Sequence, residues 1–302
     1  MLARVKIHLE IKQKNDEIRE YAEQLHAVNE EYKQIYEFLS EQTKTIEVKN
    51  KDLMDSINYA KFIQKSFLPN INKLSSIFPN SFIYEKSKEL VSGDFYFFEK
   101  IKDKIIIGIA DCTGHGVPGA MLSILGIALL IRIVQHKEIT SPKKILTILN
   151  KDLLEVLSNS ENQNKVMDGM DISICSIDLK SNILQFSGAK RPLLFFRDNK
   201  LKYYKGSVRS IGGYDDGKKQ FFNKEINLQK DDLIFLFTDG YIDQFGGEEN
   251  KKFSIKRFKN LMTEISFIKN TKEQKEKIKI VIEDWMKKEE QIDDILVMGL
   301  KI

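Results

Sequence analysis

The 302-residue sequence has few prolines, few cysteines and only a small net charge. It contains five prolines and no biased repeats, which argues against long disordered stretches. It has only two cysteines, Cys112 and Cys175, and it begins with a charged helical pattern rather than an export signal. So few thiols predict a reducing, cytoplasmic setting. Neither cysteine is followed six positions later by arginine, so a cysteine-nucleophile phosphatase loop is not supported.

Long apolar runs and a dominant charge are also missing. The longest apolar run, at 121–131, is interrupted by Arg132 and is shorter than the roughly 20 residues that span a bilayer, so we expect no direct membrane insertion. The 48 Lys and Arg residues and 44 Asp and Glu residues leave a net charge of only +4, which favours neither nucleic acid nor an anionic membrane as a partner. A length of 302 residues with 42% hydrophobic residues allows one large domain or two smaller ones.

Residues 1 to about 67 lack both proline and glycine and carry an apolar residue at every seventh position. These positions are Ile11, Ile18, Leu25, Tyr32, Leu39, Ile46, Leu53, Ala60 and Phe67. A second, weaker row contains Tyr21, Val28, Ile35 and Ile63 and lapses at Lys14, Gln42, Lys49 and Ser56. Such heptads predict a coiled coil over residues 1–68, which would make the protein a homodimer. The alternative is one amphipathic helix lying along its own domain. We favour the coiled coil because such a helix would be about 100 Å long, at about 1.5 Å per residue.

After Pro69, the pattern changes to short strands and helices. We predict strands at 81–87, 91–101, 104–111, 170–179, 183–187, 193–197, 201–204, 219–228, 232–238 and 292–301. We predict helices at 118–135, 142–157, 254–265 and 271–288, a polar loop at 158–165 and a glycine-rich connection at 206–217. Strands on both sides of a helical pair, followed by further helices, indicate an α+β layered sandwich over residues 69–302.

Four aspartates occupy similar positions at the ends of predicted strands. Asp94 follows Gly93, Asp111 precedes a glycine-rich turn, Asp239 precedes Gly240 and Asp293 precedes Asp294. If the chain forms a hairpin that turns at residues 102–103, Asp94 lies opposite Asp111. Opposed carboxylates repel unless a cation separates them, and hard divalent cations such as Mg²⁺ and Mn²⁺ prefer oxygen ligands. One such aspartate alone would be an ordinary turn or cap residue, but four together predict a metal site.

The turn after Asp111 also allows a different interpretation. Gly114, Gly116 and Gly119 spell G-x-G-x-x-G, the dinucleotide-binding pattern, so a nucleotide-binding oxidoreductase stays a less favoured alternative. Against it, residues 139–157 read as another helix instead of a second parallel strand, and Asp111 would repel a pyrophosphate. No Walker-type phosphate loop is present. We expect His115 to be a structural turn residue rather than a general acid, and the Cys112 thiol to be inert.

Six segments, in this order and spacing, resemble the SpoIIE-like serine/threonine phosphatases of the metal-dependent (PPM, type 2C) superfamily. They are VSGDFYFFE, ADCTGHGVPGAMLS, DGMDISICSID, FSGAKRPLLFF, IFLFTDGYID and QIDDILVMGL. The helix NYAKFIQKSFLPN is similar to the segment that precedes the catalytic domain in this family, so the resemblance covers residues 56–302. The heptads before it resemble a signalling coiled coil.

The resemblance implies an α-β-β-α sandwich with a pair of divalent cations, Mn²⁺ or Mg²⁺, at one end of its two sheets. The implied metal ligands are Asp94, Asp111 as the bridging ligand, the backbone carbonyl of Cys112, Asp239 and Asp293. The chain departs from the family pattern at Phe97-Phe98, Cys112-Thr113 and Leu296, but no departure removes an implied ligand.

The implied reaction is hydrolysis of phosphoserine or phosphothreonine by a metal-activated water, without a covalent phosphoenzyme. The implied substrate is a signalling protein such as an anti-sigma-factor antagonist. A catalytically inactive phosphatase-like domain that serves as a binding or scaffold module is the alternative. We expect Lys190 and Arg191 to be solvated loop charges rather than phosphate ligands. We also hypothesise that the coiled coil controls the site through the helices at 118–135 and 142–157.

Overall fold

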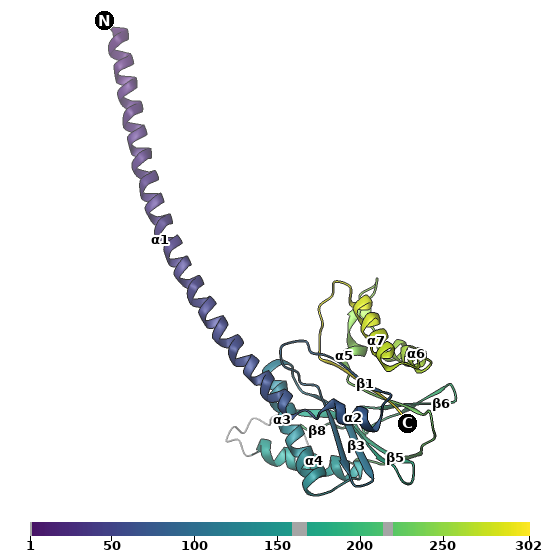
Figure 1. Cartoon of the computed structure of the whole chain (residues 1–302). Helices are drawn as coiled ribbons and strands as arrows, with labels where there is room; N and C mark the ends of the chain where they lie inside the picture. Colours follow the sequence, from purple (N-terminus) through teal and green to yellow (C-terminus); the bar gives the residue numbers. More distant parts are fainter. Residues whose placement is uncertain (1, 159–167, 214–219) are drawn as a thin grey trace. The chain divides into compact units, whose positions relative to one another are not determined.

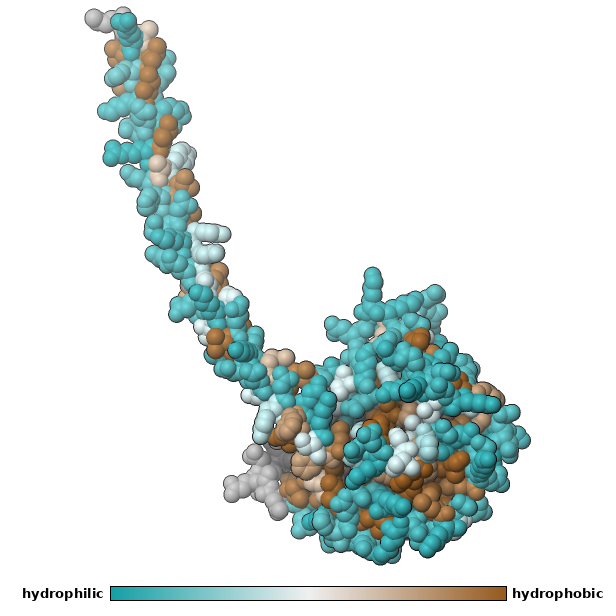
Figure 2. Space-filling model, viewed as in Figure 1, coloured by the Kyte–Doolittle hydropathy of each residue, from teal (hydrophilic) through white to brown (hydrophobic). Residues whose placement is uncertain are grey.

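The computed structural model describes residues 2–158, 168–213 and 220–302, and its contacts divide the chain into two compact units, Met1–Ser56 and Ile57–Ile302. The described part of the first unit lies within one uninterrupted helix, α1 (Leu2–Phe67). Its heptad side chains are exposed, with Ile18 and Leu25 each 63% exposed and Ile35 50% exposed. Figure 2 shows apolar side chains recurring along this helix. The predicted helix is thus confirmed, and its pairing into a coiled coil stays a prediction.

The second unit begins inside α1, before the boundary that we expected at residue 68. Within this unit the side chain of Gln64 is buried, and its amide donates hydrogen bonds to the Ser92 carbonyl (2.5 Å) and to Ser123 Oγ (2.7 Å). The last turns of the helix therefore pack as part of the second unit.

The strands of the second unit form two large sheets. One has the order β1 (Ser81–Lys86), β13 (Ile295–Lys301), β10 (Leu233–Phe237), β6 (Leu193–Arg197), β7 (Lys200–Tyr204). The other has the order β2 (Phe95–Ile101), β3 (Lys104–Cys112), β4 (Gly169–Asp178), β5 (Ile183–Ala189), β9 (Lys224–Asn227), with β8 (Ile211–Gly212) paired to β4. We call them the β13 sheet and the β3 sheet. Every pair of named strands among the described residues is antiparallel. A dinucleotide-binding fold needs parallel strands around the glycine-rich turn, so the oxidoreductase alternative is wrong.

Helices cover the outer face of each sheet (Figure 1). On the β3 sheet lie α3 (Gly116–Ile131), which continues as one π-helical turn, η1 (Arg132–His136), and α4 (Pro142–Ser158). On the β13 sheet lie α6 (Ser254–Ser266) and α7 (Thr271–Met286). The predicted α-β-β-α sandwich is confirmed.

Strand β3 lies at the centre of this sandwich, and its sequence explains how. Successive side chains of a strand point to opposite faces. Ile105, Ile107 and Ile109 pack in the core between the sheets, whereas Ile106 and Ala110 pack beneath α3 and α4. Because both faces are covered, the strand is a continuous apolar run instead of an alternating one.

Most predicted elements lie where the sequence placed them, with a few differences. Strand β2 begins at Phe95 rather than at residue 91, and α3 begins at Gly116 rather than at Pro118. Among the described residues, five short elements were not predicted: α2 (Ile71–Ile77), β8 (Ile211–Gly212), α5 (Gly240–Asp243), β11 (Phe245–Gly246) and β12 (Lys251–Lys252). The predicted loop at 158–165, apart from Ser158, and part of the connection at 206–217 lie outside the described residues.

The stretch Gly116–His136 is long and apolar enough, by length and composition alone, to cross a membrane. In this fold, most of its apolar side chains pack in the hydrophobic core. Ile127, Leu130, Ile133 and Val134 are completely buried against the β3 sheet and α4. The apolar character of this helix is therefore explained by its place in the core.

Candidate active site

The β2–β3 hairpin has the predicted register. Ile101 pairs with Lys104 at the turn and Phe95 pairs with Ala110 at the open end, so the next residues outward are Asp94 and Asp111. The Cys112 amide donates a hydrogen bond of 3.4 Å to the Gly93 carbonyl, which keeps the two chains together beyond the strands. The hairpin thus brings the first two predicted carboxylates to the same edge.

The other two carboxylates come from the β13 sheet. Asp239 follows β10 and Asp293 precedes β13, and these strands are antiparallel neighbours, so both aspartates lie at the same edge. Thr238 links the sheets at this point. Its hydroxyl donates to Asp94 Oδ2 at 2.6 Å and accepts from the Leu296 amide at 3.0 Å.

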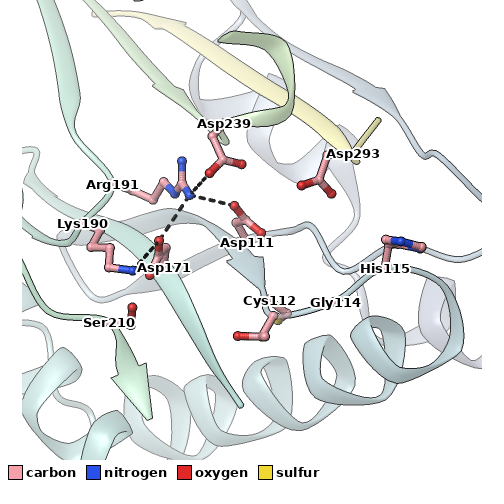
Figure 3. Close-up of a pocket in the computed structure, with 11 residues that line it drawn as sticks. Asp111, Cys112, Gly114, His115, Asp171, Lys190, Arg191, Ser210, Asp239 and Asp293 are labelled. Carbon is pink, nitrogen blue, oxygen red and sulfur yellow. Dashed lines mark hydrogen bonds and ion pairs between the residues drawn. The ribbon is translucent and has the colours of Figure 1, made fainter. Parts of the chain in front are cut away.

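A pocket of about 390 Å³ opens at this shared edge (Figure 3). Its lining residues are Asp111, Cys112, Thr113, Gly114, His115, Asp171, Lys190, Arg191, Ser210, Asp239 and Asp293. Four of the five predicted site residues line it. The fifth, Asp94, does not line the pocket and is only 5% exposed.

Asp171 is a pocket carboxylate that the sequence analysis missed. It lies in β4 directly opposite Asp111 of β3. Asp171 belongs to DGMDISICSID, one of the segments that resemble the family, but only the pairing of β3 with β4 shows that this aspartate faces the candidate site. An antiparallel alignment of these two predicted strands would have found it.

Arg191 is the second missed residue, and the prediction that it is a solvated charge is wrong. It is 8% exposed, and its Nη2 lies 2.5 Å from Asp239 Oδ2, 2.9 Å from Asp111 Oδ2 and 3.2 Å from Asp171 Oδ2 (Figure 3). A buried guanidinium needs such partners because an unpaired buried charge is very costly. Lys190 is half exposed, as expected of a loop charge, and its Nζ lies 3.6 Å from Asp171.

The buried carboxylates perturb one another. Burial, the neighbouring charge of Asp239 and a hydrogen bond to it raise the pKa of Asp111 to about 9, although Arg191 opposes the rise. Burial and the nearby Asp111 raise the pKa of Asp94 well above its usual range. Burial would also raise the pKa of Asp239, but the Arg191 charge and the hydrogen bond from Asp111 hold it below the usual value. The site therefore carries more carboxylate groups than its own cations neutralise.

The Asp293-Asp294 pair divides into two roles. The Asp294 carboxylate is buried and accepts hydrogen bonds of 2.7 Å from the amides of both Lys88 and Gly93. Asp293 lines the pocket, and burial raises its pKa. Of this pair, Asp293 thus presents its carboxylate to the pocket, and its role as a metal ligand stays a prediction.

His115 and Cys112 both lie at the turn that follows β3. His115 Nδ1 lies 2.6 Å from Glu89 Oε1 and its Nε2 lies 3.0 Å from Lys88 Nζ, so the ring joins the turn to the segment before β2. Burial raises the pKa of the Cys112 thiol well above its usual value, which disfavours the reactive thiolate. These contacts agree with a structural histidine and an inert thiol.

The donor set suits hard divalent cations. Carboxylate oxygens from Asp111, Asp171, Asp239 and Asp293 line one pocket, and their mutual repulsion is what a cation would relieve. Within the described ranges, no three His, Cys, Asp or Glu side chains are already gathered in a metal-binding arrangement. Three of the carboxylates contact Arg191 instead.

Comparisons with known proteins agree with this architecture. The phosphoserine phosphatase RsbU of Bacillus subtilis (strain 168) is 30% identical over 157 residues, a match that covers half of this chain and 42% of that relative. The chain thus matches less than two thirds of the relative's length.

Solved structures show the same fold. The PP2C domain of SiaA from Pseudomonas aeruginosa has a TM-score of 0.76 and 29% identity, over 84% of this chain and 98% of that one. The phosphatase domain and regulatory fragment of SpoIIE from Bacillus subtilis has a TM-score of 0.59 and 20% identity, over 74% of this chain and 63% of that one. The family model described as stage II sporulation protein E (SpoIIE) matches residues 102–302. This match spans well over half of the chain, which therefore belongs to the SpoIIE family of PP2C-type phosphatases.

Proposed function

We propose that this protein is a metal-dependent serine/threonine protein phosphatase. One observation carries the proposal: five aspartates from β-strand ends of both sheets gather at one edge, in a chain of a phosphatase family. By analogy with RsbU, whose name describes a phosphoserine phosphatase, the substrate is a phosphorylated signalling protein such as an anti-sigma-factor antagonist.

The proposed metal ligands are Asp94, Asp111, the Cys112 carbonyl, Asp239 and Asp293. Two bound Mn²⁺ or Mg²⁺ ions would supply an activated water at neutral pH and neutralise phosphoryl oxygens. The chain positions the ligands through the β2–β3 register and the Thr238 hydrogen bond to Asp94. No nucleophilic side chain is needed, which fits a buried Cys112 thiol with a raised pKa.

Hydrolysis of p-nitrophenyl phosphate tests this function. We expect turnover that requires Mn²⁺ and is abolished by Asp111→Asn and by Asp239→Asn, with a native circular dichroism spectrum in both variants. Turnover without added metal after chelation, or full activity in either variant, would contradict the proposal.

The second candidate is a phosphatase-like domain that binds partners without catalysis. The observation in its favour is Arg191, whose guanidinium contacts three of the pocket carboxylates. Metal or phosphoprotein binding without turnover would support this candidate over the first.

We further propose that the N-terminal helix dimerises the protein, in a cytoplasmic setting without nucleic acid, and controls the site. The described contacts offer a path: Gln64 of α1 bonds to Ser92, two residues before Asp94, and to Ser123 of α3. Because α3 begins at the turn that follows Asp111, a shift of α1 would reach both strands of the hairpin.

A further inference from the structure

The turn between β5 and β6 holds the backbone of Arg191 in one place. The Lys190 amide donates to the Ser207 carbonyl at 2.8 Å, and the Arg191 amide donates to the Ala189 carbonyl at 2.7 Å. Two glycines surround the Arg191 carbonyl. A Cβ atom added to Gly188 would lie 2.2 Å from that oxygen, and one added to Gly206 would lie 2.7 Å from it. Such distances are too short for any side chain, so this turn is packed around the arginine.

The side chain of Arg191 is committed to the carboxylates. Its Nη2 contacts an oxygen of Asp111, Asp171 and Asp239, each from a different strand or strand end. Its Nε is buried and has no hydrogen-bond partner among the described residues. A guanidinium with five donors normally forms paired bonds to one carboxylate. Here a single nitrogen is shared among three carboxylates while another donor goes unused.

The contacted oxygens are those that a divalent cation would need. Asp111 and Asp239 are proposed metal ligands, and Arg191 lies against an Oδ2 atom of each. A nitrogen of the guanidinium already lies 2.5–2.9 Å from these carboxylate oxygens. A metal ion could therefore bind them only by displacing the guanidinium, because two cations at the same oxygens repel each other.

We propose that Arg191 is an internal counter-cation that competes with the divalent cation for the carboxylates of Asp111 and Asp239. It stabilises the metal-free pocket and must release these oxygens when metal binds, so it sets the metal affinity of the site. This inference rests on the proposed metal-dependent function, and it adds a residue that opposes metal binding.

Calorimetric titration of Mn²⁺ into the metal-stripped full-length protein tests the competition. For Arg191→Met, we expect the Mn²⁺ dissociation constant to fall about tenfold or more, because close charge pairs contribute strongly to such equilibria. The same variant should have a lower melting temperature without metal and a larger upward shift with Mn²⁺. The matched control is Lys190→Met in the same turn, because Lys190 Nζ lies 3.6 Å from Asp171, which is not one of the proposed metal ligands. Its dissociation constant should change less than about twofold.

Two further variants separate the possible failures. Arg191→Lys keeps the positive charge but not the planar guanidinium, so its Mn²⁺ affinity should lie between those of the wild type and Arg191→Met. It also replaces Arg191→Met in the test if that variant does not fold. Asp111→Asn should abolish Mn²⁺ binding. If Asp111→Asn abolishes binding and Arg191→Met binds no tighter than wild type, the competition is refuted and the metal site stands. If neither wild type nor the Arg191 variants bind Mn²⁺, both proposals fail. Binding by Arg191→Met alone would support the competition most strongly.

Discussion

The adjacent residues Asp293 and Asp294 come directly before β13 and have different surroundings, so substitutions at the two positions can be compared directly. Asp294 ties the segment before β2 to the β13 sheet through two backbone amides, whereas Asp293 lines the pocket. The distinction between structural and functional carboxylates can therefore be tested at neighbouring positions.

We expect Asp294→Ala to lower the free energy of unfolding by about 2 kcal/mol or more, because it leaves two amides without their acceptor. Asp293→Ala removes one such bond, which the carboxylate accepts from the Asp294 amide at 2.8 Å, so it should lower stability by less and abolish Mn²⁺-dependent hydrolysis of p-nitrophenyl phosphate. Urea unfolding and activity assays on both variants measure this. Equal losses of stability would show that the division of roles is wrong.

Asp111 predicts a pH dependence of the metal-free protein. Its pKa is about 9 in the folded state, and the ordinary value is 3.8. Between these values the folded protein holds a proton that the unfolded chain has released, so the free energy of unfolding falls as pH rises. The slope for one group is at most about 1.4 kcal/mol per pH unit. Below about pH 4, both states are protonated and this contribution is fully retained.

We therefore expect the metal-free protein to lose stability from pH 5 to pH 9, and Asp111→Asn to flatten that decline. Urea unfolding at several pH values in the presence of a chelator measures both. Asp103→Asn, at the exposed hairpin turn, is the control and should keep the wild-type slope. An unchanged slope in Asp111→Asn would mean that Asp111 does not hold the extra proton.

Single site residues could be predicted from the sequence where their role follows from the neighbouring residues. Asp111 and Asp239 each end a strand next to glycine or a glycine-rich turn, and this can be seen within a few residues. Asp171 and Arg191 have no such local sign. Asp171 becomes a site residue through its pairing with β3, and Arg191 through the bend after β5 that turns it inward. Both depend on contacts between distant strands, which local patterns do not contain.

Among the elements, the last turns of α1 make the most consequential contact. The buried Gln64 amide bonds to Ser92 and Ser123, and the Ser92 amide donates to Gln64 Oε1 at 3.3 Å. One side chain thus satisfies groups on the segment before β2 and on α3.

We expect Gln64→Ala to lower the free energy of unfolding by about 1–3 kcal/mol, since the Ser92 backbone loses buried partners. It should also lower Mn²⁺-dependent turnover, because Ser92 lies two residues before Asp94. Lys65→Ala, on the next position of the same helix, is the control and should change neither quantity. If the two variants behave alike, Gln64 does not connect the helix to the site.

Elements with a strong periodic pattern were predictable, and short ones were not. The register of the β2–β3 hairpin was predicted on the condition that the chain turns at residues 102–103, and it does turn there. The seven-residue helix α2 was missed because it is too short to show a period, and its start depends on the side chain of Asn70, which caps the Asn72 amide. The π turn of η1 leaves no sequence signal that differs from an ordinary helix.

For the whole molecule, the exposed heptad row of α1 predicts a dimer. Leu25 and Leu39 lie on this row, and burying them against a second copy would remove large apolar side chains from water. Sedimentation of the full chain should therefore give a dimer. The double substitution Leu25→Lys with Leu39→Lys should give a monomer.

Val48→Lys provides the matched control. Val48 is equally exposed, at 61%, but lies off the heptad row, so its variant should stay dimeric. A monomeric wild type, or dissociation by all of these substitutions alike, would refute the coiled coil.

The position of β13 has a consequence for synthesis of the protein. This strand lies between β1 and β10, although more than two hundred residues separate it from β1 in sequence. While the ribosome is still translating residues before Ile295, β1 has no partner in its sheet and Asp293 has not joined the pocket. This sheet can therefore close only after β13 has been made, and until then its apolar strands are exposed to chaperones and to aggregation. A chain cut short just before this strand would lose the seven residues that join β1 to β10 in the sheet.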